Sequence, residues 1–580
     1  MTLISEATRR NWEKLNSSID DGKLRSRANK KLSRKKIIPY EYLEHKSNRP
    51  LLDTVIRSIE EDGMTLGDAL HSLAVIQLTR CGLSIDDKES YAYQLLRDYG
   101  GSFRPIFEDI EIPDDEHDFI GVVYQSLLLE GNKNETGSYY TPSSVAKDML
   151  SECAFEHGET LYDPCCGSGS ILLAADAQDY HQLYGSDIDE HAIFICKVNL
   201  LSKYPNADGF PGIILSDFLL RFKNEGVFGE TDKKYDYIAT NPPWGSKAIK
   251  ASYCHPAVPS GESASMFAIE CCKRIKPRGL CSFLLPKSLM NIAVHRDFRK
   301  YLLDHCLINS IQYYSNIFSG VTTEFVNIKF RLPCSTDTNN KTKVKKRGEV
   351  FEVPQCYFHS CEDYAFRCVP EIDREIISKV REMCCEDLGQ SEWALGIVTG
   401  DNKKKVFSEY KKGLEPVFTG KEVQPFKLSK PNKYIFFDPE NFQQTAREEI
   451  YRNPEKLVYK FISKKLVFAI DETGSLFLNS ANILIPKVPS MSTKSVLAFL
   501  NSALYQYLYI ALFDDCKILK GNLLRLPFPL IGKDQDYFLV KLVEDILDGI
   551  QSPSQVDDAV FNIFSLNQLQ RKRVMEVVYG

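Results

Sequence analysis

Short apolar runs alternate with helix-like segments in the middle of the chain, between about residues 131 and 333. The strand-like runs cover residues 160–162, 183–186, 213–215, 235–240, 280–286, 308–314 and 324–332. Helix-like segments at 171–177 and 192–201 follow the first two runs. This alternation predicts βαβ units and a mainly parallel sheet, which places the region in the α/β class.

The segments on either side of this region have different patterns. Residues 1 to about 130 are mostly helical, with apolar positions such as Leu52, Val55, Ile56 and Ile59 at intervals of three and four. A break at about 334–350, rich in Lys, Thr and Asn, is typical of a linker or an exposed hairpin tip. Short strands, turns and helices follow it. We therefore predict a helical domain over 1–130, an α/β domain over 131–345 and a mixed α/β domain over 346–580.

Composition excludes a mainly disordered or collagen-like chain. Of the 580 residues, 43% are hydrophobic and 26% are charged, close to the average of globular proteins. The 72 basic and 78 acidic residues give a net charge of −6, so nucleic acid binding requires a local basic surface.

Two segments could provide such a surface. A basic run over 23–36 is either a solvated helix face or a flexible arm, or else an arm that contacts phosphates. Residues 401–465 hold 15 Lys and Arg against 9 Asp and Glu, with aromatic residues interleaved. This second pattern is typical of a positive groove with stacking residues, and also of an ordinary domain with a solvated basic face.

The cysteines and the apolar segments indicate a reduced, cytoplasmic protein. The 17 cysteines are spread thinly, without CxxC pairs at zinc-finger spacing, and the polar start of the chain has no apolar signal core. Residues 495–513 carry no charge and approach the length of a membrane span. Because they include Asn501, Ser502 and Gln506 and repeat leucines at helical spacing, we predict a buried core helix and no membrane segment.

A glycine-containing turn follows the first predicted strand. The segment runs Asp163-Pro-Cys165-Cys-Gly167-Ser-Gly169, and a helix-like stretch begins directly after it. Glycines let the backbone pass close to a ligand and adopt positive φ, and the helix N-terminus offers unpaired N–H groups. Ligands of parallel sheets bind at the carboxyl ends of strands, where this turn lies.

Acids follow the next two strands. Asp187 lies about 20 residues beyond the turn, where a carboxylate can accept hydrogen bonds from both hydroxyls of a ribose. Asp217 follows the third strand and could accept from the amine of an adenine, with Ile188 and Phe218 flanking the ring. Each acid could simply cap a helix, but together with the turn they predict a nucleoside site.

The turn also separates two classes of nucleoside ligand. A dinucleotide site uses GxGxxG to approach a pyrophosphate. Here Asp163 begins the turn, and its carboxylate would repel a pyrophosphate but would suit a cationic sulfonium or ammonium centre. The residues therefore favour S-adenosylmethionine over NAD.

The strand at 235–240 runs into Asn241-Pro242-Pro243-Trp244. The prolines fix φ and remove backbone donors, which leaves carbonyl acceptors beside the Asn241 amide oxygen. Asn241 and the Pro242 carbonyl can accept the two protons of a ring amine while Trp244 stacks on the ring. Two acceptors help to localise the amine lone pair on nitrogen, so no metal ion is needed. The alternative is a rigid turn after a buried strand.

These residues resemble the gamma class of N6-adenine DNA methyltransferases of the restriction-modification type, over about residues 118–333. The segment Tyr140-Thr141-Pro142 resembles the family's contact to the methionine end of the cofactor. The family's cofactor turn, ribose acid, adenine-contacting pair and catalytic tetrapeptide resemble the segments described above. Asn316-Ile317-Phe318 resembles the segment whose aromatic residue faces the flipped base. The carried-over cofactor-binding residues are Tyr140, Thr141, Pro142, Asp163, Cys165, Gly167, Gly169, Asp187, Ile188, Asp217 and Phe218.

The resemblance implies a Rossmann-like catalytic domain that uses S-adenosylmethionine, between an N-terminal helical region and a C-terminal mixed α/β target-recognition domain. The implied partner is double-stranded DNA, from which an adenine is flipped at a cost of about a few kcal/mol. Whether a separate restriction endonuclease or specificity partner accompanies the chain stays open.

Two other enzyme activities compete with this interpretation. A fused restriction nuclease would need an acid followed by Glu-x-Lys, which Glu44-His45-Lys46 with Asp20 or Asp21 upstream could provide. A protein-glutamine methyltransferase would also use Asn-Pro-Pro-aromatic, but has no need of a long basic extension. A third interpretation is a DNA-binding subunit with a vestigial pocket.

Overall fold

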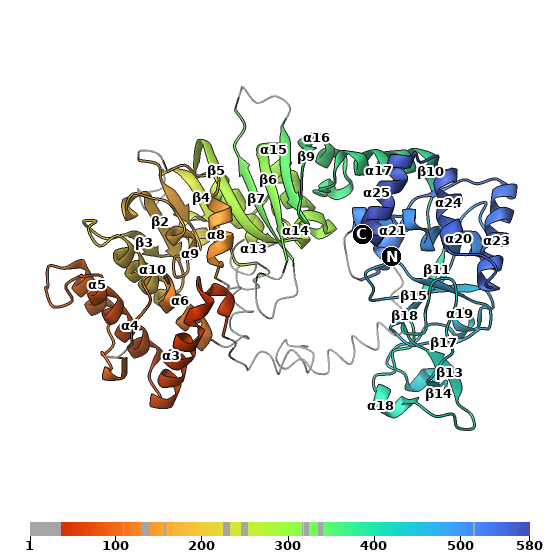
Figure 1. Ribbon diagram of the computed structural model, residues 1–580, viewed down its shortest axis with the longest axis horizontal. Helices are drawn as coiled ribbons and strands as arrows, with labels where there is room; N and C mark the ends of the chain where they lie inside the picture. Colours follow the sequence, from red (N-terminus) through yellow and green to blue (C-terminus); the bar gives the residue numbers. More distant parts are fainter. Residues whose placement is uncertain are drawn as a thin grey trace. The chain divides into compact units, whose positions relative to one another are not determined.

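The computed structural model describes residues 36, 38–107, 110–128, 140–155, 158–223, 233–244, 253, 255–315, 317, 324–334, 340–513 and 517–580. The chain divides into two compact units (Figure 1). We call residues Leu24–Cys368 the N-terminal unit and residues Val369–Gly580 the C-terminal unit, and describe each by itself.

Within its described residues, the N-terminal unit is built on a nine-stranded mixed sheet in the order β3-β2-β1-β4-β5-β7-β6-β8-β9. Strands β3, β2, β1, β4 and β5 are parallel, and β7 runs antiparallel to both β5 and β6. The strands are β1 Leu161–Asp163, β2 Leu183–Asp187, β3 Gly212–Leu215, β4 Tyr235–Thr240, β5 Ile275–Pro286, β6 Leu307–Tyr314, β7 Phe325–Arg331, β8 Lys341–Lys346 and β9 Glu349–Pro354. The predicted α/β sheet with a parallel first half is confirmed.

Helices pack on this sheet and on one another in the same unit. They are α3 Arg49–Asp62, α4 Leu66–Arg80, α5 Tyr91–Tyr99, α6 Phe119–Leu127, α8 Ser143–Leu150, α9 Ser170–Leu173, α10 Glu190–Lys203, α11 Phe218–Lys223, α13 Ser263–Cys272, α14 Ser288–Asn291, α15 Arg296–His305 and α16 Gln355–Ser360. Helices α4, α5 and α6 contact α10, which follows β2 (Figure 1). Their apolar faces share one hydrophobic core with the first strands of the sheet.

The predicted helical start of the chain is therefore confirmed over α3 to α6, and the spacing of Leu52, Val55, Ile56 and Ile59 reports the buried face of α3. Of the basic run over 23–36, only Lys36 belongs to the described residues, and it pairs with Glu60 at 2.8 Å. The remainder of that run lies outside them.

Of the two alternatives for the break at 334–350, the exposed hairpin tip is the one found: the chain turns at Arg347 and Gly348 between two strands. Lys341–Lys346 forms β8, parallel to β6 and antiparallel to β9. Thr342 and Val344 are buried, whereas the lysines at 341, 343 and 345 are exposed. A hydrophobic search missed this strand because its outward positions are all lysine and one of its inward positions is threonine.

The C-terminal unit combines small sheets with a helical layer. Its described strands are β10 Cys384–Glu386, β11 Glu392–Ala394, β12 Val406–Phe407, β13 Glu415–Phe418, β14 Tyr434–Ile435, β15 Lys456–Lys460, β16 Phe468–Asp471, β17 Leu476–Phe477, β18 Ala481–Ile485 and β19 Phe528–Pro529. The helices are α17 Glu371–Met383, α18 Asn402–Lys405, α19 Glu448–Arg452, α20 Thr493–Asn501, α21 Ala503–Leu512, α22 Lys520–Leu523, α23 Lys533–Leu547, α24 Ser554–Ile563 and α25 Gln568–Tyr579. This composition matches the mixed α/β fold that the sequence predicts.

The uncharged stretch at 495–513 is buried, but it forms two helices and not one. Helices α20 and α21 meet at 63° around Ser502, whose side chain accepts a hydrogen bond from the Tyr505 N–H and caps α21. Among the described residues, no single helix is long and apolar enough to cross a membrane, and this bent pair alone meets the test of length and composition.

Candidate active site

Four predicted site residues lie at one edge of the N-terminal sheet, which we call the carboxyl edge. Asp163 ends β1, Asp187 ends β2, and Asp217 and Asn241 lie one or two residues beyond β3 and β4. These strands are parallel neighbours in the order β3-β2-β1-β4. Their ends therefore meet in one row, with the asparagine beside Asp163 and the two other acids on the opposite side.

The glycine turn after β1 needs its glycines for two reasons. Gly167 has φ +52° and Gly169 has φ +95°, which L side chains rarely adopt. A Cβ at Gly167 would lie 2.9 Å from the Tyr140 ring, and one at Gly169 would lie 2.8 Å from the Cys196 sulfur. Helix α9 begins directly behind the turn at Ser170. The turn is thus packed closely from both sides.

Asp187 ties the turn to the loop after β2. Its carboxylate accepts hydrogen bonds from the Gly167 N–H at 2.9 Å and from the Asp189 N–H at 3.0 Å. Burial raises the pKa of Asp187, although the backbone donors oppose that shift. The next residue, Ile188, is 70% exposed, which is unusual for an isoleucine beside a buried strand. An apolar face therefore lies open next to a carboxylate.

The loop after β3 is organised differently. Asp217 accepts a hydrogen bond from the Leu220 N–H at 3.0 Å, at the start of α11. Phe218 is 2% exposed, and its ring stacks on Phe267 with centroids 5.2 Å apart. The structure thus brings Ile188 to the surface at this edge, but places Phe218 in the core.

Asp163 is a buried carboxyl group with neutral hydrogen-bond donors. It is 1% exposed and accepts from the Cys165 N–H at 3.0 Å. Burial is the main cause that raises its pKa to about 7; the Asp187 charge acts in the same direction, and the hydrogen bond from the Cys165 N–H opposes them. Burial likewise raises the pKa of the Cys165 thiol well above its usual value. A cation placed beside Asp163 would favour its charged form.

The Asn-Pro-Pro-Trp segment leaves β4 as a braced loop. Asn241 is half-buried, and the Pro243 carbonyl accepts a hydrogen bond from the Ser263 hydroxyl at 2.6 Å. The Trp244 ring lies 5.5 Å from the ring of Phe325 at a tilt of 58°. Trp244 also packs against both hydrophobic cores of the N-terminal unit. Phe318, predicted to face the target base, lies outside the described residues, as does Asn316.

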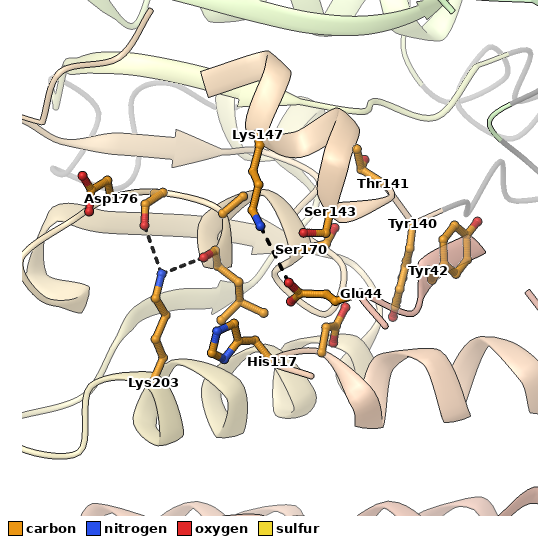
Figure 2. A pocket seen from close by; sticks show the side chains of 14 residues that line it. Tyr42, Glu44, His117, Tyr140, Thr141, Ser143, Lys147, Ser170, Asp176 and Lys203 are labelled. Atoms are coloured by element: carbon orange, nitrogen blue, oxygen red, sulfur yellow. Dashed lines mark hydrogen bonds and ion pairs between the residues drawn. The ribbon is translucent and has the colours of Figure 1, made fainter. Parts of the chain in front are cut away.

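A cavity of about 240 Å³ lies beside Ser170, the first residue after the glycine turn (Figure 2). Tyr140 and Thr141 line it, while Pro142 caps the start of α8. Lys147 reaches Glu44 at 3.8 Å, and Lys203 donates to the carbonyls that end α9 (Figure 2). The lining is Tyr42, Glu44, His117, Asp118, Tyr140, Thr141, Ser143, Lys147, Ser170, Leu173, Ala174, Ala175, Asp176 and Lys203. The cavity therefore adjoins the turn but does not extend to the ends of β2, β3 and β4.

Sequence reasoning missed a residue that touches the turn. Asp118 precedes α6 and accepts hydrogen bonds from the Ser168 hydroxyl at 2.5 Å and the Asn199 amide at 2.7 Å. Asp118 is half-buried and borders the cavity, and burial raises its pKa to about 7. The available signal was an acid at the N-cap position of an apolar helix that carries a glycine and a tyrosine at three-residue intervals.

The nuclease-like segment Glu44-His45-Lys46 contacts the acidic residues that precede α6. The backbone N–H groups of Glu44 and His45 donate to the Glu116 carboxylate, and the His45 ring lies 3.2 Å from Asp115. Lys46 begins a short 3-10 turn. Asp20 and Asp21 lie outside the described residues.

The basic and aromatic stretch at 401–465 separates into core and surface residues. Phe418, Phe426, Tyr451 and Tyr459 are buried in the C-terminal unit. Tyr410 and Phe436 are exposed, and so are most of the lysines. The exposed lysines are Lys403, Lys404, Lys411, Lys412, Lys421, Lys427, Lys430, Lys464 and Lys465. The positive charge of this stretch therefore lies at the surface, whereas about half of its aromatic residues belong to the hydrophobic core.

Two family models match the chain. The model described as N-6 DNA Methylase matches residues 115–350, which include the whole carboxyl edge. The model described as TaqI-like C-terminal specificity domain matches residues 415–528 of the C-terminal unit.

Curated proteins with related sequences include two type II methyltransferases. The chain is 31% identical over 319 residues to M.VspI of Vibrio sp. (strain 343), covering 52% of this chain and 74% of that protein. It is 23% identical over 403 residues to M.PstI of Providencia stuartii, covering 61% and 77%. The type I EcoEI methylase subunit of Escherichia coli is 25% identical over 236 residues, covering 37% and 46%. The chain therefore spans less than half of that type I subunit.

Solved structures of restriction-modification enzymes share the fold. The type IIL enzyme MmeI in complex with DNA superposes with a TM-score of 0.56 at 12% identity, covering 93% of both chains. The DrdV–DNA complex gives a TM-score of 0.50 at 13% identity, covering 87% of this chain and 69% of that one.

Proposed function

The chain belongs to the N-6 DNA methylase family of restriction-modification methyltransferases, and we propose which of its residues carry out methyl transfer to the N6 amine of adenine in double-stranded DNA. The observation that supports the assignment is the row of Asp217, Asp187, Asp163 and Asn241 along four adjacent strand ends. Three of these positions suit a nucleoside with a positive charge, and the fourth suits an amine.

The residues on one side of the row fit S-adenosylmethionine. When bound, this cofactor supplies a methyl group on a positively charged sulfur. Asp187 would accept from the ribose hydroxyls, and Asp217 from the adenine amine beside exposed Ile188. Asp163 would face the positive charge, because its buried carboxyl has neutral donors and a raised pKa. Tyr140 and Thr141 would receive the methionine end where they line the cavity.

Asn241 and Pro242 would hold the target amine. The Asn241 amide oxygen and the Pro242 carbonyl accept its two protons, which keeps the nitrogen lone pair out of the ring system. The hydrogen bond from Ser263 to the Pro243 carbonyl fixes the loop, so these acceptors need no reorganisation. Trp244 offers an aromatic face beside them, and Phe318 is proposed to cover the other side of the base.

The C-terminal unit would bind the DNA. A paired adenine cannot bring N6 to the cofactor, so the base must leave the stack at a cost of about a few kcal/mol. The exposed lysines of the 401–465 stretch suit phosphates, and exposed Tyr410 and Phe436 suit stacking or wedging. We place the enzyme in the cytoplasm and assign target recognition to the C-terminal unit, because residues 346–368 of the segment predicted for it complete the N-terminal unit.

One experiment tests the catalytic assignment. Purified chain is given S-adenosylmethionine and mixed-sequence DNA, and modified bases are mapped by sequencing. We expect N6-methyladenine in one sequence context from the wild type. Asn241→Ala should abolish methylation and retain cofactor binding by calorimetry. Asn206→Ala, at an exposed position of the same unit, is the matched control and should methylate normally. Full methylation by Asn241→Ala would refute the acceptor role.

A further inference from the structure

Helix α6 contacts the glycine turn through a built hydrogen-bond network. Asp118, directly before the helix, accepts from the Ser168 hydroxyl at 2.5 Å and from the Asn199 amide at 2.7 Å. Asn199 also donates to the Ser168 carbonyl at 3.1 Å. Ser168 and Asn199 are each 1% exposed. The hydroxyl and the carbonyl of Ser168, which lies between the two glycines of the turn, are therefore both held by side chains from other elements.

The network continues into the helical start of the chain. Gln77 on α4 donates to the Asn199 carbonyl oxygen at 3.1 Å, and both side chains are buried. Asn199 thus accepts from Gln77 and donates to Asp118 and Ser168. Because its donors and acceptor are all used, its amide orientation is defined by its neighbours.

The close approach of α6 depends on a glycine. A Cβ at Gly121 would lie 2.2 Å from the Asp118 carboxylate and 2.5 Å from the Ser168 hydroxyl. Any side chain there would push the turn and the helix apart. The missing side chain at Gly121 is a second, steric observation, independent of the hydrogen bonds, that α6 and the turn fit together.

The same helix reaches the loop after β2. Tyr124 donates its hydroxyl to Asp189 at 2.5 Å, while the other oxygen of that carboxylate caps α10. Asp189 lies two residues beyond Asp187, the proposed ribose acceptor. One turn and a half of helix thus touches two of the loops assigned to the cofactor.

We infer that α6 is a brace for the cofactor site, in which Asp118 is a positioning residue that sets the glycine turn through Ser168, and Tyr124 sets the loop after β2 through Asp189. The inference rests on the proposed function for the identity of the ligand. Asp118 holds the turn and also borders the cavity proposed for the methionine end, so we expect its effect on cofactor binding. Its loss should weaken cofactor binding without slowing the transfer step.

The brace can be tested without any ligand. Hydrogen exchange of the amides at 163–170 is measured in the free protein for the wild type, Asp118→Asn, Ser168→Ala and Gly121→Ala. We expect each variant to raise exchange in that segment by about tenfold. Two controls should leave it unchanged: Asp114→Asn, at an exposed acid, and Ser126→Ala, whose hydroxyl bonds only within α6.

Binding and kinetics provide the functional readout. The three variants should raise the Kd and KM for S-adenosylmethionine by about tenfold, while kcat and DNA affinity stay within about twofold. Asp118→Asn combined with Ser168→Ala should cost no more than the worse single variant, because both remove one contact. Tyr124→Phe should show a smaller rise.

The outcomes separate the two proposals. If the wild type binds no S-adenosylmethionine, the proposed function fails, and the exchange data still decide the brace. Unchanged exchange and unchanged cofactor affinity in both Asp118→Asn and Ser168→Ala would overturn the brace. A fall in kcat with unaltered KM would also overturn it. Should Asp118→Asn fold poorly, the milder Ser168→Ala carries the test.

Discussion

Two buried carboxylates, one in each unit, are held in opposite ways: Asp471 in the C-terminal unit and Asp163 in the N-terminal unit. In the C-terminal unit, Asp471 is buried with Lys456, whose ammonium donates to it and to the Tyr451 and Asn453 carbonyls. Burial is the largest single influence and raises the pKa of Asp471, but the hydrogen bonds from Lys456, Thr473 and the Ser475 N–H, together with the Lys456 charge, lower it overall. In the N-terminal unit, Asp163 is equally buried, receives neutral donors, and has its pKa raised to about 7.

The difference distinguishes a buried carboxylate that stabilises the fold from one that is available to bind a ligand. A buried charge whose counter-ion is part of the chain is complete when the chain folds, and breaking the pair is costly. Asp163 has no ion pair within the described residues, so a bound cation would supply its counter-charge. The contrast predicts that changes at Asp471 affect folding, whereas changes at Asp163 affect ligand affinity.

The largest expected effect is on stability. Lys456→Met leaves the Asp471 charge buried without its cation, and should lower the unfolding free energy of the C-terminal unit by about 3–5 kcal/mol. Urea denaturation measures the loss. The double variant Lys456→Met with Asp471→Leu should recover most of it, since it removes both charges. If Lys456→Met were as stable as the wild type, the ion pair with Asp471 would not stabilise the fold, and the contrast with Asp163 would fail.

The next effect is on cofactor affinity. Asp163→Asn keeps the shape of the side chain but removes its charge, and should weaken S-adenosylmethionine binding by about tenfold or more, without loss of stability. Calorimetry should show a smaller loss for S-adenosylhomocysteine, whose sulfur is neutral. Equal losses for both compounds would mean that Asp163 does not face the positive charge.

A pH series sharpens the same point. The ionised form of Asp163 favours a cationic ligand, and its pKa lies near 7 in the free protein. Affinity for S-adenosylmethionine should therefore be full above pH 7 and fall by up to about tenfold per unit as the pH drops below it. Calorimetric Kd values at pH 6, 7 and 8 measure this slope. Asp163→Asn should be flatter than the wild type, which isolates this group from nearby Asp118 and Asp187.

The smallest expected effect is at an exposed ion pair. Lys487 bonds Glu392 at 2.8 Å, and both side chains are about half exposed. Lys487→Gln should shift the melting temperature by less than about 3 °C, because solvent screens such pairs. A loss as large as that of Lys456→Met would show that burial does not distinguish the two pairs.

Sequence patterns predicted the parallel half of the sheet because short apolar runs alternate with helix-like segments there and several of the runs end in distinctive turns. The row formed by Asp163, Asp187, Asp217 and Asn241 follows from that prediction, since parallel strands end at one edge. The family assignment inferred from residues 118–333 is confirmed by the family model over 115–350. The chemical roles of the individual side chains stay predictions.

What the sequence could not reveal depends on contacts between distant segments. Helix α6 is apolar enough to predict, but nothing local indicates that Asp118 meets Ser168, 50 residues away. Likewise, the break between α20 and α21 lies at Ser502, whose side chain caps α21. The leucine spacing had predicted a single continuous helix there. The periodicity of a sequence shows which face of a helix or strand is buried. The residues that this face contacts depend on the tertiary fold.

The β8–β9 pair determines where the chain could be cut. A chain shortened at residue 345 would remove β9 and leave β8 as an unfinished outer strand, open to pairing with other molecules. It would also discard Val353, Phe358 and Phe366, which complete the apolar interior. Ending the shortened chain at Cys368 instead keeps the hairpin closed and these side chains covered.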